Sequence, residues 1–197
     1  GENYLIDSTD GYAIIARKVL TEGLLPEEKV NVRGSALPER APQFTTLAAI
    51  YEMNKRLVEG KTNIAFEHKQ IKPDDTEVDE AWLSVQEYWN ALFDKLDGFK
   101  KAVEGKPQDL RRPGEPYSLI MKPIAQMALV DALVNATKDD KMSFDQAITK
   151  ANKIDWNIEA KIWKNVLVKG DQKIDQGKSA RNRAAALMTY FIAGNKL

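Results

Sequence analysis

The chain of 197 residues contains no cysteine. Without thiols it cannot form disulfides, thiolate zinc sites or iron-sulfur clusters, and it has no cysteine nucleophile, which fits a reducing compartment. The one histidine, His68, cannot by itself supply the usual zinc sites or histidine-dependent triads. We therefore predict no metal site, no cofactor and no catalytic residue, and we interpret His68 as a solvated side chain.

Long apolar runs are absent too. No stretch approaches the roughly eighteen uninterrupted apolar residues of a membrane span, and the N-terminus carries no basic and then apolar leader. We expect a soluble, cytoplasmic protein with no membrane partner. Gly177-Lys-Ser179 resembles the end of a phosphate-binding loop, but it lacks the glycine five residues earlier and a preceding strand, so we do not interpret it as one.

The composition is that of a folded domain. Hydrophobic residues make up 43% of the chain, enough for a sizeable core in one domain or two small ones. Helical spacing dominates, and residues 30–32 and 64–66 are weak strand candidates. We predict a mainly α multi-helix bundle, a single domain over residues 1–197 with at most a small β element.

One amphipathic stretch, residues 78–103, organises this prediction. Its large apolar residues follow one another at alternating steps of four and three: Val78, Trp82, Val85, Trp89, Leu92, Leu96, Phe99 and Val103. This spacing places all eight on one stripe of a helix. Although glycine inside a helix costs about 1 kcal/mol, we expect the helix to continue through Gly98, with a bend at most.

The stripe must be covered in one of two ways. Other helices of the chain could bury it as an ordinary core, or a second copy could pair with it in a homodimer, because four heptads are enough for a coiled coil. The spacing alone leaves both open.

Capping residues and breakers define the other elements. We predict helix starts at Asp10, at Thr45 or Thr46, near Pro123, at Ser143 and at Ser179. Residues 105–116 contain three prolines and Arg111-Arg112, and we predict a polar linker and the possible internal hinge there.

Charge is uneven although the net charge is zero. Residues 74–104 hold nine acidic and three basic residues, a balance of minus six, whereas residues 153–197 hold nine basic and four acidic, a balance of plus five. Carboxylates in the group 74–80 could in principle hold magnesium, but an acidic first helical turn explains them better. The basic end suits an anionic partner, or attraction to the acidic segment.

Two basic segments are candidate phosphate sites. The loop 33–40 offers Arg33, Ser35 and Arg40 on a backbone shaped by glycine and proline. Such a loop can bind a phosphate group, but its two arginines could equally form ion pairs with the acidic segment, residues 74–104.

The second candidate is the helix start at residues 178–183, with Lys178, Ser179, Arg181 and Arg183. Free amides and a partial positive charge favour anions there, and cations usually avoid that end of a helix. Arg181 and Arg183 point about 200° apart around the axis, so they could contact neighbouring phosphates but not grip the same one. The alternative is a solvated terminus, or pairing with Asp171 or Asp175.

These pieces occur in a recognisable order. It begins with DGYAIIARKVL at residues 10–20, SALPER at 35–40 and FTTLAAIY at 44–51, and continues with the helix around Trp89, IDW at 154–156, Trp163 and KSARN at 178–182. The sequence resembles the C-terminal part of DndB-like proteins, members of the DGQHR-domain family encoded in DNA phosphorothioation and other DNA modification clusters. Their DGQHR motif, in an N-terminal half, is absent from this chain, so we expect a C-terminal fragment.

The resemblance implies a DNA-binding, transcription-regulating role beside DNA sulfur modification. It favours phosphate contacts at both basic segments, with DNA and other modification proteins as partners. The competing interpretation is an interaction or dimerisation module of a modification or defence complex, with the basic residues paired internally. A third, nucleotide hydrolysis completed by the missing half, would make the whole protein an enzyme, and we expect no catalysis by this fragment alone.

Overall fold

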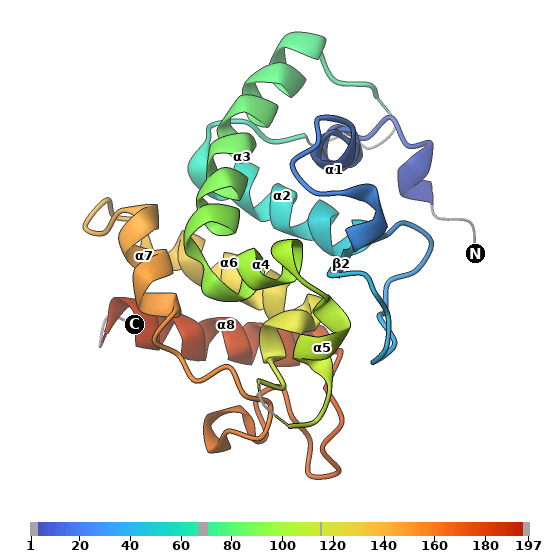
Figure 1. Cartoon of the computed structure of the whole chain (residues 1–197). Helices are drawn as coiled ribbons and strands as arrows, with labels where there is room; N and C mark the ends of the chain where they lie inside the picture. Colours follow the sequence, from blue (N-terminus) through green and yellow to red (C-terminus); the bar gives the residue numbers. More distant parts are fainter. Residues whose placement is uncertain (1–3, 67–70, 115, 195–197) are drawn as a thin grey trace.

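The computed structural model describes residues 4–66, 71–114 and 116–194, and its architecture is mainly α-helical with a small β element, as predicted (Figure 1). The α-helices are α1 Gly11–Thr21, α2 Leu47–Lys61, α3 Asp75–Lys95, α4 Asp97–Glu104, α5 Pro107–Arg111, α6 Pro123–Ala136, α7 Phe144–Ala151 and α8 Lys178–Ala193. The 3-10 helices are η1 Tyr4–Ile6, η2 Glu27–Lys29, η3 Leu119–Met121 and η4 Lys161–Trp163. Among the described residues, no helix is long and apolar enough to cross a membrane.

Several helices begin where local capping chemistry predicts. The Asp10 carboxylate accepts a hydrogen bond from the Tyr12 amide at 3.0 Å and starts α1, and the Thr46 hydroxyl accepts from the Ala49 amide at 3.0 Å and starts α2. Ser143 starts α7 with a reciprocal capping box to Gln146. These caps satisfy amides that a helix start leaves unpaired.

The predicted helix through residues 78–103 is broken, so the expectation of continuity was wrong. Leu96 leaves the helical conformation between α3 and α4, with ψ 109°. The Asn152 side chain satisfies the backbone on both sides of this break, donating to the Lys95 carbonyl at 2.8 Å and accepting from the Asp97 amide at 3.0 Å. Gly98 then lets α4 approach η3, because a Cβ there would lie 2.9 Å from Ile120.

The apolar stripe of residues 78–103 is buried in the hydrophobic core of the chain itself. Seven of its eight side chains, from Val78 to Phe99, are at most 6% exposed, and Val103 is half-buried. Trp89 is fully buried and its indole nitrogen donates to Asn54 at 2.7 Å. The stripe is therefore covered by the chain's own core, the first of the two alternatives, and a homodimer through the helix of residues 78–103 stays a prediction.

Helix α6 lies at the centre of the bundle, between α2 and α8 (Figure 1). It is apolar on nearly every side, as expected for a helix packed all round, and ten of its fourteen residues are buried. Gly60 permits the close approach of α2, since a Cβ there would meet Val134 at 2.3 Å. This packing sets α2, α6 and α8 side by side as the frame of a surface groove.

A two-stranded parallel sheet joins the two ends of the loop that contains residues 33–40, called the basic loop below. Strand β1, Val30–Asn31, pairs with β2, Thr45–Thr46, in the register Val30 to Thr45. The strand candidate at 64–66 was wrong, because this segment has no strand conformation. The sheet fixes both ends of the intervening loop, residues 32–44.

The predicted hinge at 105–116 contains a helix, α5, whose last residue is fully buried: Arg111 has no exposed surface. The described part of the segment therefore includes a short helix with a buried arginine, and its role as a hinge stays a prediction. Its buried arginine ties it to two other parts of the chain.

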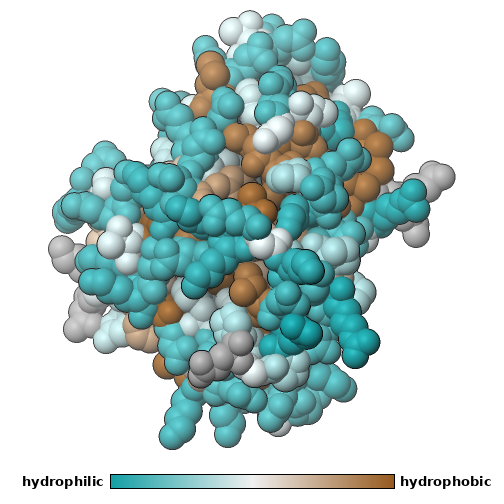
Figure 2. Space-filling model, in the orientation of Figure 1, coloured by the Kyte–Doolittle hydropathy of each residue, from teal (hydrophilic) through white to brown (hydrophobic). Residues whose placement is uncertain are grey.

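The chain before α8 is irregular but anchored. Trp156 and Trp163 stack with ring centroids 5.5 Å apart, and each indole nitrogen donates to a backbone carbonyl. The face shown in Figure 2 is largely hydrophilic, including its lower edge, where Figure 1 shows these loops. Among the residues that the structure describes, the exposed large hydrophobic side chains are those of Ile6, Ile71, Leu83, Tyr190 and Phe191.

Candidate nucleic-acid interface

The basic loop is shaped at its start by Asn31. The Asn31 side-chain oxygen accepts hydrogen bonds from the Arg33 and Gly34 amides at 3.1 and 3.3 Å, and its nitrogen donates to the Ala36 carbonyl at 3.3 Å. An asparagine that bonds the backbone following it is a common turn former. The turn is thus encoded by its own sequence.

The far end of the loop is held by Arg111. Its guanidinium donates to the carbonyls of Ala41 at 2.8 Å and Gln43 at 2.7 Å, and its Nε donates to the Met121 carbonyl at 3.0 Å. Burial lowers the pKa of Arg111 to about 10. This role of Arg111 could not be read from the sequence, which placed it in the predicted linker, because its partners lie up to 73 residues away in the chain.

The loop presents its three predicted site residues to solvent. Arg33, Ser35 and Arg40 are all exposed, and neither arginine makes an ion pair with any residue that the structure describes. Pairing with the acidic helix, the alternative for this loop, does not occur there. Both guanidinium groups remain available to an external anion.

The start of α8 differs from the prediction by two residues. The helix begins at Lys178 with Gly177 as its N-cap, whereas Ser179 was predicted to cap it. The Asp175 carboxylate accepts from the Gly177 amide at 2.9 Å, which lowers the pKa of Asp175. Lys178 and Ser179 are exposed on the first turn, and the lysine makes no ion pair with a described residue.

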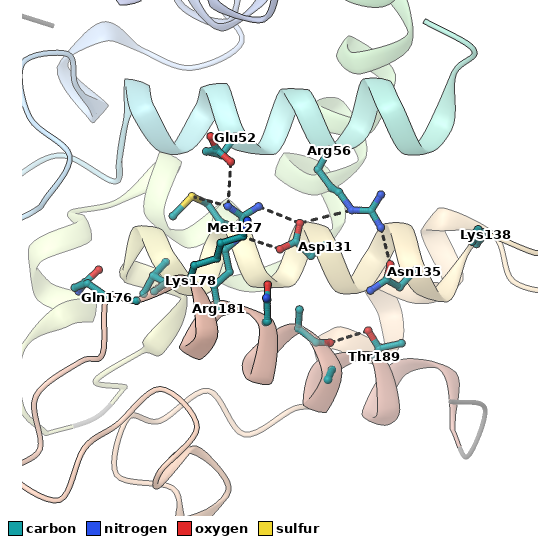
Figure 3. Close-up of a pocket in the computed structure, with 15 residues that line it drawn as sticks. Glu52, Arg56, Met127, Asp131, Asn135, Lys138, Gln176, Lys178, Arg181 and Thr189 are labelled. Atoms are coloured by element: carbon teal, nitrogen blue, oxygen red, sulfur yellow. Dashed lines mark hydrogen bonds and ion pairs between the residues drawn. The ribbon is translucent and has the colours of Figure 1, made fainter. Parts of the chain in front are cut away.

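Arg181 is turned inward and is held by two carboxylates. Its guanidinium donates to both oxygens of Asp131 at 2.8 and 3.0 Å and to Glu52 at 3.1 Å (Figure 3). Burial lowers the pKa of Arg181, but these ion pairs outweigh burial and leave it above the ordinary value. Asp131 also lies 3.7 Å from Arg56. The cluster joins α2, α6 and α8, so Arg181 is not free at the helix start.

Arg183 points away from Arg181, as the helical geometry predicts, and contacts residues close to it in the sequence. It donates to the Ser179 hydroxyl at 3.0 Å and lies 3.5 Å from the Asp175 carboxylate. The pairing with Asp175, one of the two alternatives, therefore occurs. Its side chain is 45% exposed, and a surface ion pair of this kind contributes less than about 1 kcal/mol.

A groove of about 950 Å³ runs between α2, α6 and α8, lined by Arg181 and by Gln176 and Lys178 (Figure 3). Gln176 also lines a second hollow of about 320 Å³, whose walls include Ser35 from the basic loop and Lys173. The two predicted segments, more than 130 residues apart in sequence, thus border adjoining hollows.

The second hollow contains a lysine that sequence reasoning missed. Lys122 precedes Pro123 at the start of α6 and lines this hollow. Burial lowers the pKa of Lys122, the nearby Arg111 lowers it further, and Glu39 opposes them. The feature of the sequence that could have indicated this residue is a lysine immediately before a helix that begins with proline.

The acidic segment serves as a helix start. The Asp74 carboxylate accepts from the Thr76 amide at 2.7 Å and caps α3, and Asp75 pairs with Lys72 at 3.1 Å. Hydrogen bonds from the Thr76 backbone and side chain lower the pKa of Asp74. The described part of the chain contains no group of three or more acidic or histidine side chains placed to hold a metal, and His68 lies outside it.

Comparison with known families gives one result that covers almost the whole sequence. The sequence model of the DndB family, described as DNA-sulfur modification-associated, matches residues 3–193. Searches of curated proteins and of solved structures gave no match. The resemblance predicted from the sequence is confirmed, while the assignment to the C-terminal part of a longer protein stays a prediction. The chain belongs to the DndB family of proteins associated with DNA sulfur modification.

Proposed function

We propose that this chain is a non-catalytic, regulatory DNA-binding domain that acts beside DNA sulfur modification. It contacts the phosphate backbone through the basic loop and the start of α8. The observation that carries this proposal is that Arg33, Arg40 and Lys178 are exposed cations without ion partners in the described residues. Phosphate contacts position a protein on DNA without reading its sequence, so binding is salt-sensitive and weakly selective.

The hollows between the two segments support the proposal further. Ser35, Lys122 and Lys173 line the hollow that adjoins the α8 groove, where Lys178 lies. A row of cations along connected depressions suits a polyanion better than a single phosphate group. Arg183 joins this surface once its exposed pairing with Asp175 is exchanged for a phosphate, whereas Arg181 supports the helices from inside.

The test is binding of a fluorescent DNA duplex at low and moderate salt. We compare the wild type with a variant carrying Arg33→Ala, Arg40→Ala, Lys178→Ala and Arg183→Ala, and circular dichroism checks folding first. A control matched in charge, Lys100→Ala, Lys106→Ala, Lys141→Ala and Lys150→Ala, removes four exposed lysines that line none of these hollows. Salt-sensitive binding that the variant loses and the control keeps is expected. Absence of wild-type binding, or equal binding by all three, contradicts the proposal.

A second candidate function is a protein-interaction module, favoured by one feature of α3. Leu83 is 63% exposed on this helix, and exposed acidic residues such as Glu80 and Glu87 flank it. Protein interfaces typically have an apolar centre and a polar rim. Sedimentation separates the candidates, because a concentration-dependent oligomer without DNA binding favours the module and a DNA-binding monomer favours the first proposal.

A further inference from the structure

A third hollow, of about 260 Å³, lies between Tyr117 and the loops that precede α8. Lys161, Lys164 and Lys169 line it, all three are exposed, and none makes an ion pair with a described residue. None of these lysines belongs to the two basic segments, 33–40 and 178–183. The hollow adjoins the second one, because Tyr117 and Gln172 line both.

The backbone of this hollow is held in an unfavourable conformation at two points. Tyr117 has φ 37° and Gln172 has φ 62°, in the left-handed region that glycine or asparagine normally occupies. The strain at Tyr117 is maintained by its neighbours, since its carbonyl accepts from the Ile158 amide at 2.9 Å and the Ser118 amide donates to the Leu110 carbonyl at 2.7 Å. Bulky residues kept in such conformations concentrate at binding sites.

The aromatic side chain is partly buried beside the hollow. Burial raises the pKa of the Tyr117 phenol, and the nearby carboxylates of Glu39 and Glu159 raise it further. The phenol therefore stays neutral at any physiological pH. Glu39 lines the second hollow and Glu159 the third, so the phenol lies within electrostatic reach of both.

The volume of the third hollow and the side chains that line it limit the class of ligand that it can bind. The volume lies below the roughly 300 to 1,000 Å³ of pockets that enclose whole small ligands, and it suits one planar ring system. Proteins that hold unpaired nucleic acid combine an aromatic surface for the base with lysines or arginines for the backbone. Tyr117 and the three lysines supply these two elements in one place.

We infer that this hollow binds a single unpaired nucleotide of a DNA strand, with its base stacked on Tyr117 and the neighbouring phosphates held by Lys161, Lys164 and Lys169. This inference rests on the proposed DNA-binding function and adds to it a preference for DNA in which a base is out of the helical stack. The rest of the strand continues over the cations of the adjoining hollow.

The experiment compares two duplexes of the same sequence, one fully paired and one with a single bulged 2-aminopurine, by anisotropy and by 2-aminopurine fluorescence. Tyr117→Asn removes the ring and places a residue that tolerates the left-handed backbone there, so this variant keeps its fold. Tyr117→Phe keeps the ring.

We expect the wild type and Tyr117→Phe to bind the bulged duplex about tenfold more tightly than the paired one, with quenched fluorescence. Tyr117→Asn loses this preference and keeps the affinity for the paired duplex. Paired-duplex binding without a preference in the wild type, or with a preference that Tyr117→Asn retains, overturns this inference alone. Absence of binding to both duplexes overturns the proposed function as well. If free dAMP competes as well as the bulged strand, the site takes free nucleotides and the strand assignment is wrong.

Discussion

Each of the two basic segments carries two arginines, yet the structure uses them differently. In the loop 33–40 both arginines are exposed and unpaired within the described residues, whereas at the start of α8 Arg181 is largely buried in an ion-pair cluster and Arg183 contacts Asp175. A guanidinium that already has two carboxylate partners has little to offer a phosphate. An arginine that can bind DNA therefore differs from a structural one in having an exposed guanidinium without a carboxylate partner. The number of charges in a segment does not reveal this difference.

An inward-turned arginine supports each segment, fully buried in the case of Arg111 and largely buried in the case of Arg181. Arg111 holds the loop through backbone carbonyls, without a carboxylate, and Arg181 holds the helix start through Asp131 and Glu52. The loop is thus shaped by a cation that stays beneath it while its own arginines face solvent. The predictions below separate supporting arginines from exposed ones.

The largest expected effect is at Arg111. Arg111→Met keeps most of the side-chain volume but leaves the carbonyls of Ala41, Gln43 and Met121 without their donor, so we expect the free energy of unfolding to fall by about 3 kcal/mol or more. Urea denaturation measures it. Arg112→Met is the matched control, because Arg112 is exposed and its ion pair with a described residue is the one with Asp109, and its effect should stay within about 0.5 kcal/mol. Equal effects would show that Arg111 does not anchor the loop.

Arg181 should rank second. Arg181→Met leaves Asp131 with the more distant Arg56 as partner, and we expect a loss of about 2 kcal/mol in unfolding free energy, because the pair is largely but not fully buried. Arg183→Met, two residues on, should change it by less than about 0.5 kcal/mol. Thermal and urea unfolding of both variants test this order, and the reverse order contradicts the assignment.

A smaller effect, on DNA affinity, is expected when the ion pair between Arg183 and Asp175 is removed. Asp175→Asn removes its carboxylate partner but keeps an oxygen for the Gly177 amide, so duplex binding should tighten about threefold. Asp94→Asn on α3 makes the same change of net charge at an exposed site remote from the hollows. If both variants bind alike, the gain reflects net charge and not a freed arginine.

The same carboxylate predicts a pH dependence of small size. The Gly177 amide, then Lys169 and Arg183, hold the pKa of Asp175 below its ordinary value. The carboxylate therefore stabilises the turn before α8 at pH above that ordinary value, near 3.9, and this stabilisation is lost as pH falls through the lower folded pKa. The NMR shift of the Gly177 amide should titrate with a midpoint below 3.9. A midpoint at or above it contradicts the capping role.

The features that the sequence predicted correctly depend on neighbouring residues. Asp10, Thr46 and Ser143 cap amides two or three residues away, and the stripe from Val78 to Phe99 follows one periodicity. Local chemistry of this kind is visible in the sequence itself, which is why helix starts and core residues could be predicted.

The features that it missed depend on partners far away in the chain. The break at Leu96 is stabilised by Asn152, and the fate of Arg181 is decided by Asp131 and by Glu52, which is 129 positions away. Nothing near Arg181 in sequence distinguishes it from Arg183. Packing of α2, α6 and α8 makes the distinction, and a single sequence does not encode it in any local pattern.

The most direct test of the central claim is the salt dependence of duplex binding by two variants. In Arg33→Ala with Arg40→Ala the slope of log affinity against log salt should become shallower by about 1.8, because each phosphate contact contributes about 0.9. In Arg181→Met, measured on folded protein, the slope should equal that of the wild type. If Arg181→Met flattens the slope and the loop variant leaves it unchanged, the buried arginine is the DNA contact and the account given for the two segments is wrong.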